Sequence, residues 1–195
     1  MENSENIWND ENLIEVLRKN GVVVMPTDTL YGIVGQALNS SVVERIYFLR
    51  KRNPEKPCII LIGTIDELEK FSVILSEEQK EFFARTVLAK DAKDGPVSIV
   101  LDCPDKKFLY LHRATKTLAF RIPFSQPLRD LLLKTGPLIA PSANLEALPP
   151  SETISEAKKY FGNLIDLYVD GGKLTGKASK VIRLRKDGTI SIIRE

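Results

Sequence analysis

The stretch Leu138-Ile139-Ala140-Pro141-Ser142-Ala143-Asn144 runs from apolar residues directly into a small polar loop. The short apolar run predicts a buried strand, and the loop after it presents a hydroxyl and an amide with little side chain in the way. The same order occurs earlier, where Val22 to Met25 leads into Pro26-Thr27-Asp28-Thr29-Leu30-Tyr31-Gly32. Each loop taken alone is also typical of a simple turn. Two such loops can hold a polar ligand at the ends of strands.

A third segment adds positive charge. Arg50-Lys51-Arg52-Asn53-Pro54-Glu55-Lys56-Pro57 concentrates basic side chains directly after a predicted helix. By itself this run is typical of a solvated helix end, where cations interact favourably with the helix dipole. Together with the two hydroxyl-bearing loops, it predicts a site for a phosphorylated ligand.

The composition is that of one ordinary globular domain. The chain has 195 residues, of which 43% are hydrophobic and 28% charged, and this suffices for one sizeable core. Cys58 and Cys103 are far apart and are expected to be small buried residues in a reducing compartment. The N-terminus is polar, and no apolar run approaches the roughly 20 residues that cross a membrane. We therefore expect a cytoplasmic protein without a membrane partner.

The charge distribution is more informative than the net charge of +2. From Lys173 to Lys186 there are six basic residues and no acid. One interpretation is an edge strand protected by lysines. The other is a rim that attracts polyanions such as RNA.

The hydrophobic pattern alternates between helical and strand periods along the whole chain. N-terminal helix caps are expected at Asn9 or Asp10, and at the pairs Ser41/Glu44, Thr64/Glu67, Ser76/Gln79 and Thr153/Glu156. Strands are expected at 22–25, 58–62, 97–101, 117–121, 138–140, 167–169, 179–184 and 189–193. The last two are joined by a turn at 186–188. This pattern predicts one α/β (α+β) domain with a mixed sheet flanked by helices.

Several kinds of catalytic chemistry lack support. The only histidine, His112, has no cysteine or acid beside it in the sequence, so a triad or an imidazole metal site is not favoured. Neither nucleotide-binding glycine motif is present, and there is no Cys-x-x-Cys or His-Glu-x-x-His pattern. What remains is catalysis by positioning and charge stabilisation, as in phosphoryl and nucleotidyl transfer.

Five segments in order resemble motifs of one known family. They are Pro26 to Gly32, Arg50 to Pro57, Thr117-Leu118-Ala119-Phe120-Arg121-Ile122-Pro123, Ala140 to Asn144, and Gly176-x-x-Ser179. The family is the YrdC/Sua5 group, the L-threonylcarbamoyladenylate synthases. The resemblance runs from about residue 10 to residue 185. It favours the short YrdC-type form, so residues 1–195 are expected to be a single domain without the C-terminal domain of Sua5.

This resemblance implies a strongly twisted mixed sheet with a basic cavity, and a nucleotidyltransferase reaction. L-threonine, bicarbonate and ATP would give threonylcarbamoyl-AMP and pyrophosphate. Partner proteins would then transfer the threonylcarbamoyl group to adenosine 37 of tRNAs that read ANN codons. Contact of this chain with tRNA would be indirect or direct.

The resemblance also implies roles for residues. Arg50 and Arg52 would be catalytic. ATP would be bound by Arg52, Lys56, Thr117, Ser142 and Asn144, and threonine by Thr29, Arg121, Ala140 and Ser179, with Arg121 pairing the carboxylate. Mg²⁺ would be held by the ATP phosphates rather than by a protein metal site.

The chain departs from the family pattern at several positions. Arg50 stands where lysine is usual, Leu61 where many members have histidine, and Lys180 where threonine follows the serine. Further departures are Val34-Gly35-Gln36, Lys93-Asp94 and Pro150. They bear on threonine specificity more than on ATP binding.

Two other functions stay open. One is a non-catalytic, YciO-like protein that binds RNA, double-stranded RNA included, through its basic residues. The other is a carbamoyl-adenylate enzyme with a different acceptor, similar to the corresponding domain of hydrogenase-maturation carbamoyltransferases.

Overall fold

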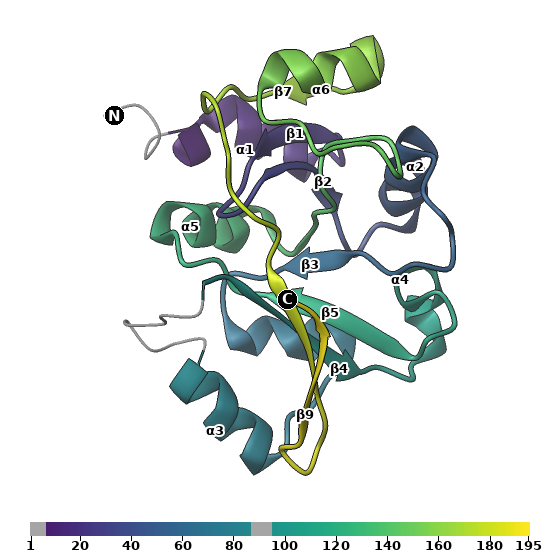
Figure 1. Cartoon of the computed structure of the whole chain (residues 1–195), viewed down its shortest axis with the longest axis vertical. Helices are drawn as coiled ribbons and strands as arrows, with labels where there is room; N and C mark the ends of the chain where they lie inside the picture. Colours follow the sequence, from purple (N-terminus) through teal and green to yellow (C-terminus); the bar gives the residue numbers. More distant parts are fainter. Residues whose placement is uncertain (1–6, 87–94) are drawn as a thin grey trace.

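The computed structural model describes residues 7–86 and 95–195, so the departure at Lys93-Asp94 lies outside the described residues. Within them, nine strands form one mixed sheet in the order β7-β1-β2-β6-β3-β5-β4-β8-β9 (Figure 1). The strands are β1 (Val23–Pro26), β2 (Tyr31–Gln36), β3 (Ile59–Leu61), β4 (Val97–Asp102), β5 (Thr117–Arg121), β6 (Leu138–Ile139), β7 (Leu167–Tyr168), β8 (Lys180–Leu184) and β9 (Ile190–Arg194).

Helices cover this sheet. They are α1 (Glu11–Arg18), α2 (Ser40–Arg50), α3 (Glu77–Thr86), α4 (Leu109–His112), α5 (Gln126–Thr135) and α6 (Ile154–Phe161), with short 3₁₀ segments η1 (Ile7–Asn9), η2 (Ile65–Phe71), η3 (Lys106–Phe108) and η4 (Gly162–Leu164). The twisted mixed sheet flanked by helices confirms the predicted fold class. Within the described ranges, no helix has the length and hydropathy needed to span a bilayer.

Alternation along the strands separates two hydrophobic cores. On β1, Val23 and Met25 point to one face of the sheet, where they pack with residues of α1 and α5. Val22 and Val24 belong to the larger core on the opposite face, which includes residues of α2, η2 and α3. Figure 1 shows α1 and α5 on the same side of the molecule, beside β1 and β2.

The face covered by α1 and α5 stays open farther along the sheet. On β5, Leu118 and Phe120 are buried in the larger core. The alternate residues Thr117, Ala119 and Arg121 therefore point to the other face, where they line a cavity. The sheet extends beyond its helical cover on this side, and that extension creates the candidate site.

One strand was not expected from the sequence. Residues Tyr31–Gln36 form β2, which pairs antiparallel with β1 and with β6. Gly32 and Gly35 weaken the strand pattern, because glycine is disfavoured in strands. Packing explains Gly35, since a Cβ atom there would lie 2.4 Å from Val42 of α2. Close packing of the helix therefore favours glycine where local sequence suggests a loop.

The expected helix caps have mixed outcomes. Asp10 caps α1, and Ser76 and Gln79 each bond the other's backbone N–H, as a capping box requires. The cap predicted at Ser41/Glu44 is wrong: Asn39 caps α2 two residues earlier, and its side chain accepts from the backbone N–H groups of residues 41 and 42. Thr64 precedes a 3₁₀ segment rather than an α-helix and makes no side-chain cap bond.

The basic segment 173–186 is not an edge strand. Its strand β8 lies inside the sheet, between β4 and β9. Two of its charges have acidic partners: Lys173 pairs with Glu152, and Arg183 with Asp102. The edge-strand interpretation is therefore wrong, because β9 occupies the edge.

Candidate functional site

The open face of the sheet carries a cavity of about 480 Å³. Seven of the ten site residues expected from the sequence line it: Thr29, Arg52, Thr117, Arg121, Ala140, Ser142 and Ser179. They come from five separate segments of the chain, so tertiary folding brings the resembling motifs to one place. The rest of the lining is largely apolar and includes Leu30, Ile59, Val100, Ala119 and Val181.

Backbone pairing joins the first two hydroxyl-bearing loops. The amide of Ala143 donates to the carbonyl of Tyr31 at 2.8 Å, and the amide of Ile33 donates to that of Pro141 at 3.0 Å. Gly32 and Ser142 form an isolated β-bridge between these bonds. Ser142 is thus fixed beside the start of β2 by main-chain contacts, which suits a group that positions a ligand.

A glycine brings the segment 176–179 against the loop that follows β1. A Cβ atom on Gly176 would lie 2.0 Å from the carbonyl oxygen of Thr29, so only glycine allows this approach. Three residues later, the Ser179 hydroxyl lies 2.8 Å from that of Ser98 in β4. Thr29 in turn lies 3.0 Å, oxygen to oxygen, from the Thr27 hydroxyl. This corner of the cavity is therefore rich in hydroxyls and tightly packed.

Arg121 supplies a buried positive charge at the cavity. Its guanidinium lies 3.0 Å from the Asp28 carboxylate, and both side chains are almost fully buried. Burial lowers the pKa of Arg121, and the neighbouring carboxylate opposes that shift. Arginine stays protonated in proteins, so the cavity has a permanent cation that Asp28 neutralises in part.

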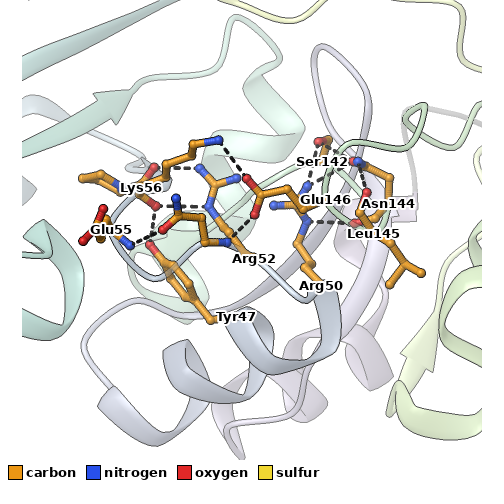
Figure 2. A network of polar contacts seen from close by, with 11 residues as sticks. Tyr47, Arg50, Arg52, Glu55, Lys56, Ser142, Asn144, Leu145 and Glu146 are labelled. Carbon is orange, nitrogen blue, oxygen red and sulfur yellow. Dashed lines mark hydrogen bonds and ion pairs between the residues drawn. The ribbon is translucent and has the colours of Figure 1, made fainter.

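Three expected site residues do not line the cavity: Arg50, Lys56 and Asn144. Arg50 and Asn144 are buried, and Figure 2 shows them beside Ser142. The Arg50 guanidinium donates to the Asn144 carbonyl at 3.0 Å and to its side-chain oxygen at 3.2 Å. That same oxygen accepts from the Ser142 hydroxyl at 2.6 Å. In this structure Arg50 and Asn144 support Ser142 and do not themselves face the cavity.

Tyr47 organises the basic loop. Its hydroxyl donates to the Lys56 carbonyl at 2.8 Å, and its ring lies 3.9 Å from the guanidinium carbon of Arg113. Arg52 donates to the carbonyls of Lys56 and Pro57 at 3.1 and 3.0 Å. Figure 2 shows Tyr47 and Arg52 directed toward the loop between α2 and β3 that contains Lys56. The loop is thus held in one conformation that presents Arg52 to the cavity.

The structure shows where two positions that depart from the family pattern, Leu61 and Pro150, lie relative to the cavity. Leu61 is fully buried in the core beside α1 and α5, and does not line the cavity. Leu61 therefore does not take the place of a histidine that contacts a ligand in the cavity. Pro150 lines the cavity, whereas Ser151 is buried and donates to the Ala143 carbonyl at 2.6 Å.

The sequence interpretation did not find Arg194, in the last strand. This arginine lines the cavity and donates from Nη2 to the Ser179 carbonyl at 2.7 Å. It lies beyond residue 185, where the resembling motifs end. The alternation of β9 was visible, but only the pairing of β9 with β8 turns Arg194 toward Ser179.

No protein metal centre is evident in the part of the chain that the structure describes. Those residues contain no group of three or more His, Cys, Asp or Glu side chains arranged to hold an ion. His112 is buried in α4 and does not line the cavity. The cavity therefore offers hydroxyls and cations, a combination that suits an anionic ligand.

A family model covering the Sua5, YciO and YrdC proteins, described as telomere recombination, matches residues 15–195. The chain belongs to this family. The resemblance seen in the sequence motifs is thereby confirmed. Human threonylcarbamoyl-AMP synthase is 30% identical over 186 residues, which cover 91% of this chain and 63% of the human protein. The enzyme of that name from Hahella chejuensis is 28% identical over 190 residues, which cover 96% of this chain and 98% of that protein.

Solved structures of the family have the same fold. The crystal structure of P. abyssi Sua5 complexed with L-threonine matches with a TM-score of 0.82 and 26% identity, over 96% of this chain and 54% of that one. E. coli YciO matches with a TM-score of 0.74 and 26% identity, over 98% of this chain and 89% of that one. The chain thus spans 63% of the human and 48% of the P. abyssi synthase.

Proposed function

We propose that this chain is a threonylcarbamoyl-AMP synthase, a nucleotidyltransferase. The observation that carries the proposal is the single cavity shared by Arg52, Arg121, Thr117, Ser142 and Ser179. It offers the cations of Arg52 and Arg121 for two anionic groups, as a triphosphate and an amino-acid carboxylate require. Relatives and structures of the family bearing that name or a bound threonine support the assignment.

The reaction balances with ATP, L-threonine and bicarbonate. The threonine amine and bicarbonate give a carbamate and water. A carbamate oxygen then forms a bond to the α-phosphorus of ATP, and the bond from that phosphorus to the bridging oxygen breaks to release pyrophosphate. The protein has to position the two reactants and stabilise the phosphate charge, which fixed cations and hydroxyls do.

Roles follow from the geometry. Arg52 faces the cavity and would contact the phosphates, with Lys56 beside it at the basic loop and Thr117 and Ser142 as hydroxyl partners. Arg121 would pair the threonine carboxylate, with Thr29, Ala140 and Ser179 around it. Arg50 and Asn144 would act through Ser142, because neither lines the cavity.

Mg²⁺ would enter with ATP. Among the described cavity residues, no acid lines the wall, and the nearby Asp28 is paired with Arg121. This donor set fits an ion held mainly by phosphate oxygens and water. Such an ion neutralises phosphate charge.

The partner proteins and the cellular compartment also belong to this proposal. The product would go to proteins that transfer the threonylcarbamoyl group to tRNA. The compartment would be the cytoplasm, because Cys58 and Cys103 are both buried and free, as in a reducing environment.

The test is pyrophosphate release by the purified chain with ATP, Mg²⁺ and bicarbonate, with and without L-threonine, and with L-serine for comparison. Threonine-dependent release, with the adenylate identified by mass spectrometry, is the expected result. Arg52→Ala should abolish it or raise the ATP KM, while Arg18→Ala on α1 should leave it unchanged. ATP binding without any release under these conditions would contradict the proposal.

That negative result would point to the alternatives. A different acceptor would show release with another amine, whereas an RNA-binding protein would bind RNA with an affinity that falls steeply with salt.

A further inference from the structure

Glu146 lies where the basic loop meets the loop after β6. Its carboxylate lies 3.0 Å from the Lys56 ammonium and also accepts from the backbone N–H of Asn53 (Figure 2). Its own backbone N–H donates to the Arg50 carbonyl at 2.9 Å. The contacts with Asn53 and Arg50 therefore fix Glu146 to the basic loop, and its carboxylate also pairs with Lys56.

Lys56 is the more exposed partner in this ion pair. Its side chain is 62% exposed, whereas that of Glu146 is 23% exposed. Exposed ion pairs of this kind contribute little free energy, and the lysine side chain has many rotamers. The ammonium can thus turn from Glu146 toward a phosphate group held by Arg52, whose guanidinium donates to the Lys56 carbonyl.

Glu146 would remain in place when Lys56 turns away. Hydrogen bonding from the Asn53 backbone N–H is the main cause that holds the pKa of Glu146 below its usual value, and Lys56 adds to it. The carboxylate is therefore ionised at neutral pH and stays anchored to the main chain. A negative charge so close to the basic loop repels phosphate oxygens.

We propose that Glu146 is an internal counter-ion, which competes with the phosphate chain of the nucleotide for Lys56 and limits how tightly the site holds pyrophosphate. This inference rests on the proposed function, because it requires phosphates at Arg52. Pyrophosphate carries concentrated charge and lacks the contacts of the nucleoside, so its binding responds most to Glu146. The carboxylate thereby favours product release at a cost in ATP affinity.

The test is calorimetric titration of pyrophosphate and of inorganic triphosphate, with Mg²⁺ present, into the wild type and Glu146→Gln. Glutamine keeps an acceptor for the Asn53 N–H but removes the charge. We expect both anions to bind about three- to tenfold more tightly at low ionic strength, with the difference shrinking at high salt. Equal or weaker binding by Glu146→Gln would overturn the proposal.

Glu55→Gln is the matched control. Glu55 lies in the same loop, and its carboxylate is in no hydrogen bond or ion pair of the described part of the chain. The Glu55→Gln variant should bind both anions with the affinity of the wild type, within about twofold. An equal gain in affinity for Glu55→Gln would show a general charge effect and would overturn the specific role of Glu146.

Two further measurements keep the test decisive. In a Lys56→Ala background, Glu146→Gln should have a smaller effect on anion affinity, because the cation for which Glu146 and phosphate compete has been removed.

If Glu146→Gln does not fold, Glu146→Asp is the second variant. It withdraws the carboxylate from Lys56 and should give a smaller gain in anion affinity than expected for Glu146→Gln. No gain in affinity overturns the proposal. Failure of the wild type to bind triphosphate would overturn the ATP site itself, not only the role of Glu146.

Discussion

The guanidinium of Arg121 lies 3.0 Å from the carboxylate of Asp28, with 4% and 6% of the two side chains exposed. Neither Asp28 oxygen makes an aligned hydrogen bond within the described residues, so charge rather than hydrogen-bond geometry holds the pair. Arg121 also lines the cavity. One arginine thus neutralises a buried acid and presents a cation to a ligand.

Removal of Arg121 should reveal both roles. Arg121→Ala leaves Asp28 buried without its partner, which should cost about 3–5 kcal/mol of unfolding free energy in urea denaturation. Adding Asp28→Asn should recover part of that stability, because the unpaired charge is removed. The threonine KM should remain high in the double variant and rise more than the ATP KM. Equal changes in both KM values would contradict the carboxylate assignment.

Ser142 and Asn144 should respond differently to truncation. Asn144 donates to the carbonyls of Leu145 and Leu148 at 2.7 and 2.8 Å, and its oxygen accepts from Arg50. Asn144→Ala should therefore cost about 2–4 kcal/mol in stability as well as nucleotide affinity. Ser142→Ala should cost only about 1 kcal/mol but weaken ATP binding. Denaturation and ATP titration of both variants check this, and a stable Asn144→Ala protein would refute the supporting role.

Tyr47 should affect ATP use without facing the cavity. Tyr47→Phe removes the bond to the Lys56 carbonyl and loosens the basic loop, so the ATP KM should rise about three- to tenfold with little change in kcat. Tyr168→Phe is the control, because its hydroxyl also donates to a carbonyl at 2.8 Å but on β7. A similar KM effect in both variants would exclude a specific role for Tyr47.

Asp166 should make stability depend on acid pH. It accepts two bonds from Arg45 and one from the Val22 backbone N–H, and the Arg45 bonds are the main cause that lowers its pKa. A lowered pKa stabilises the fold above the unfolded value of about 4, and this stabilisation is lost as the pH falls through the folded pKa.

Asp166→Asn tests that dependence. Both partners are 39% exposed and screened by solvent, so the loss at pH 7 should be about 1 kcal/mol. The variant and wild type should converge in stability as the pH falls below about 4, through the lowered pKa of Asp166. Asp66→Asn, in an exposed position, is the control. A constant difference across this range would contradict the assignment.

Local patterns predicted most of the fold because they depend on neighbouring residues. Alternation of apolar and polar residues predicted the strand at Thr117–Arg121, and the three-residue spacing of Ser76 and Gln79 predicted a helix cap. Both predictions are confirmed. The strand at Tyr31–Gln36 was missed, because its glycines are explained by contacts with segments outside it, such as α2. The cap at Ser41 was wrong, because Asn39 competes for the same helix start.

By itself, the sequence determined the kinds of groups at the site: hydroxyl-bearing loops at strand ends and a basic loop after a helix. These are properties of residue type and local order. Only the tertiary structure decided which groups face the cavity and which are neutralised. Asp28 meets Arg121, and Lys56 meets Glu146, across about 90 residues of chain in each case. Arg194 reaches Ser179 only through the pairing of β8 with β9. Such contacts depend on packing between distant segments, which no local pattern specifies.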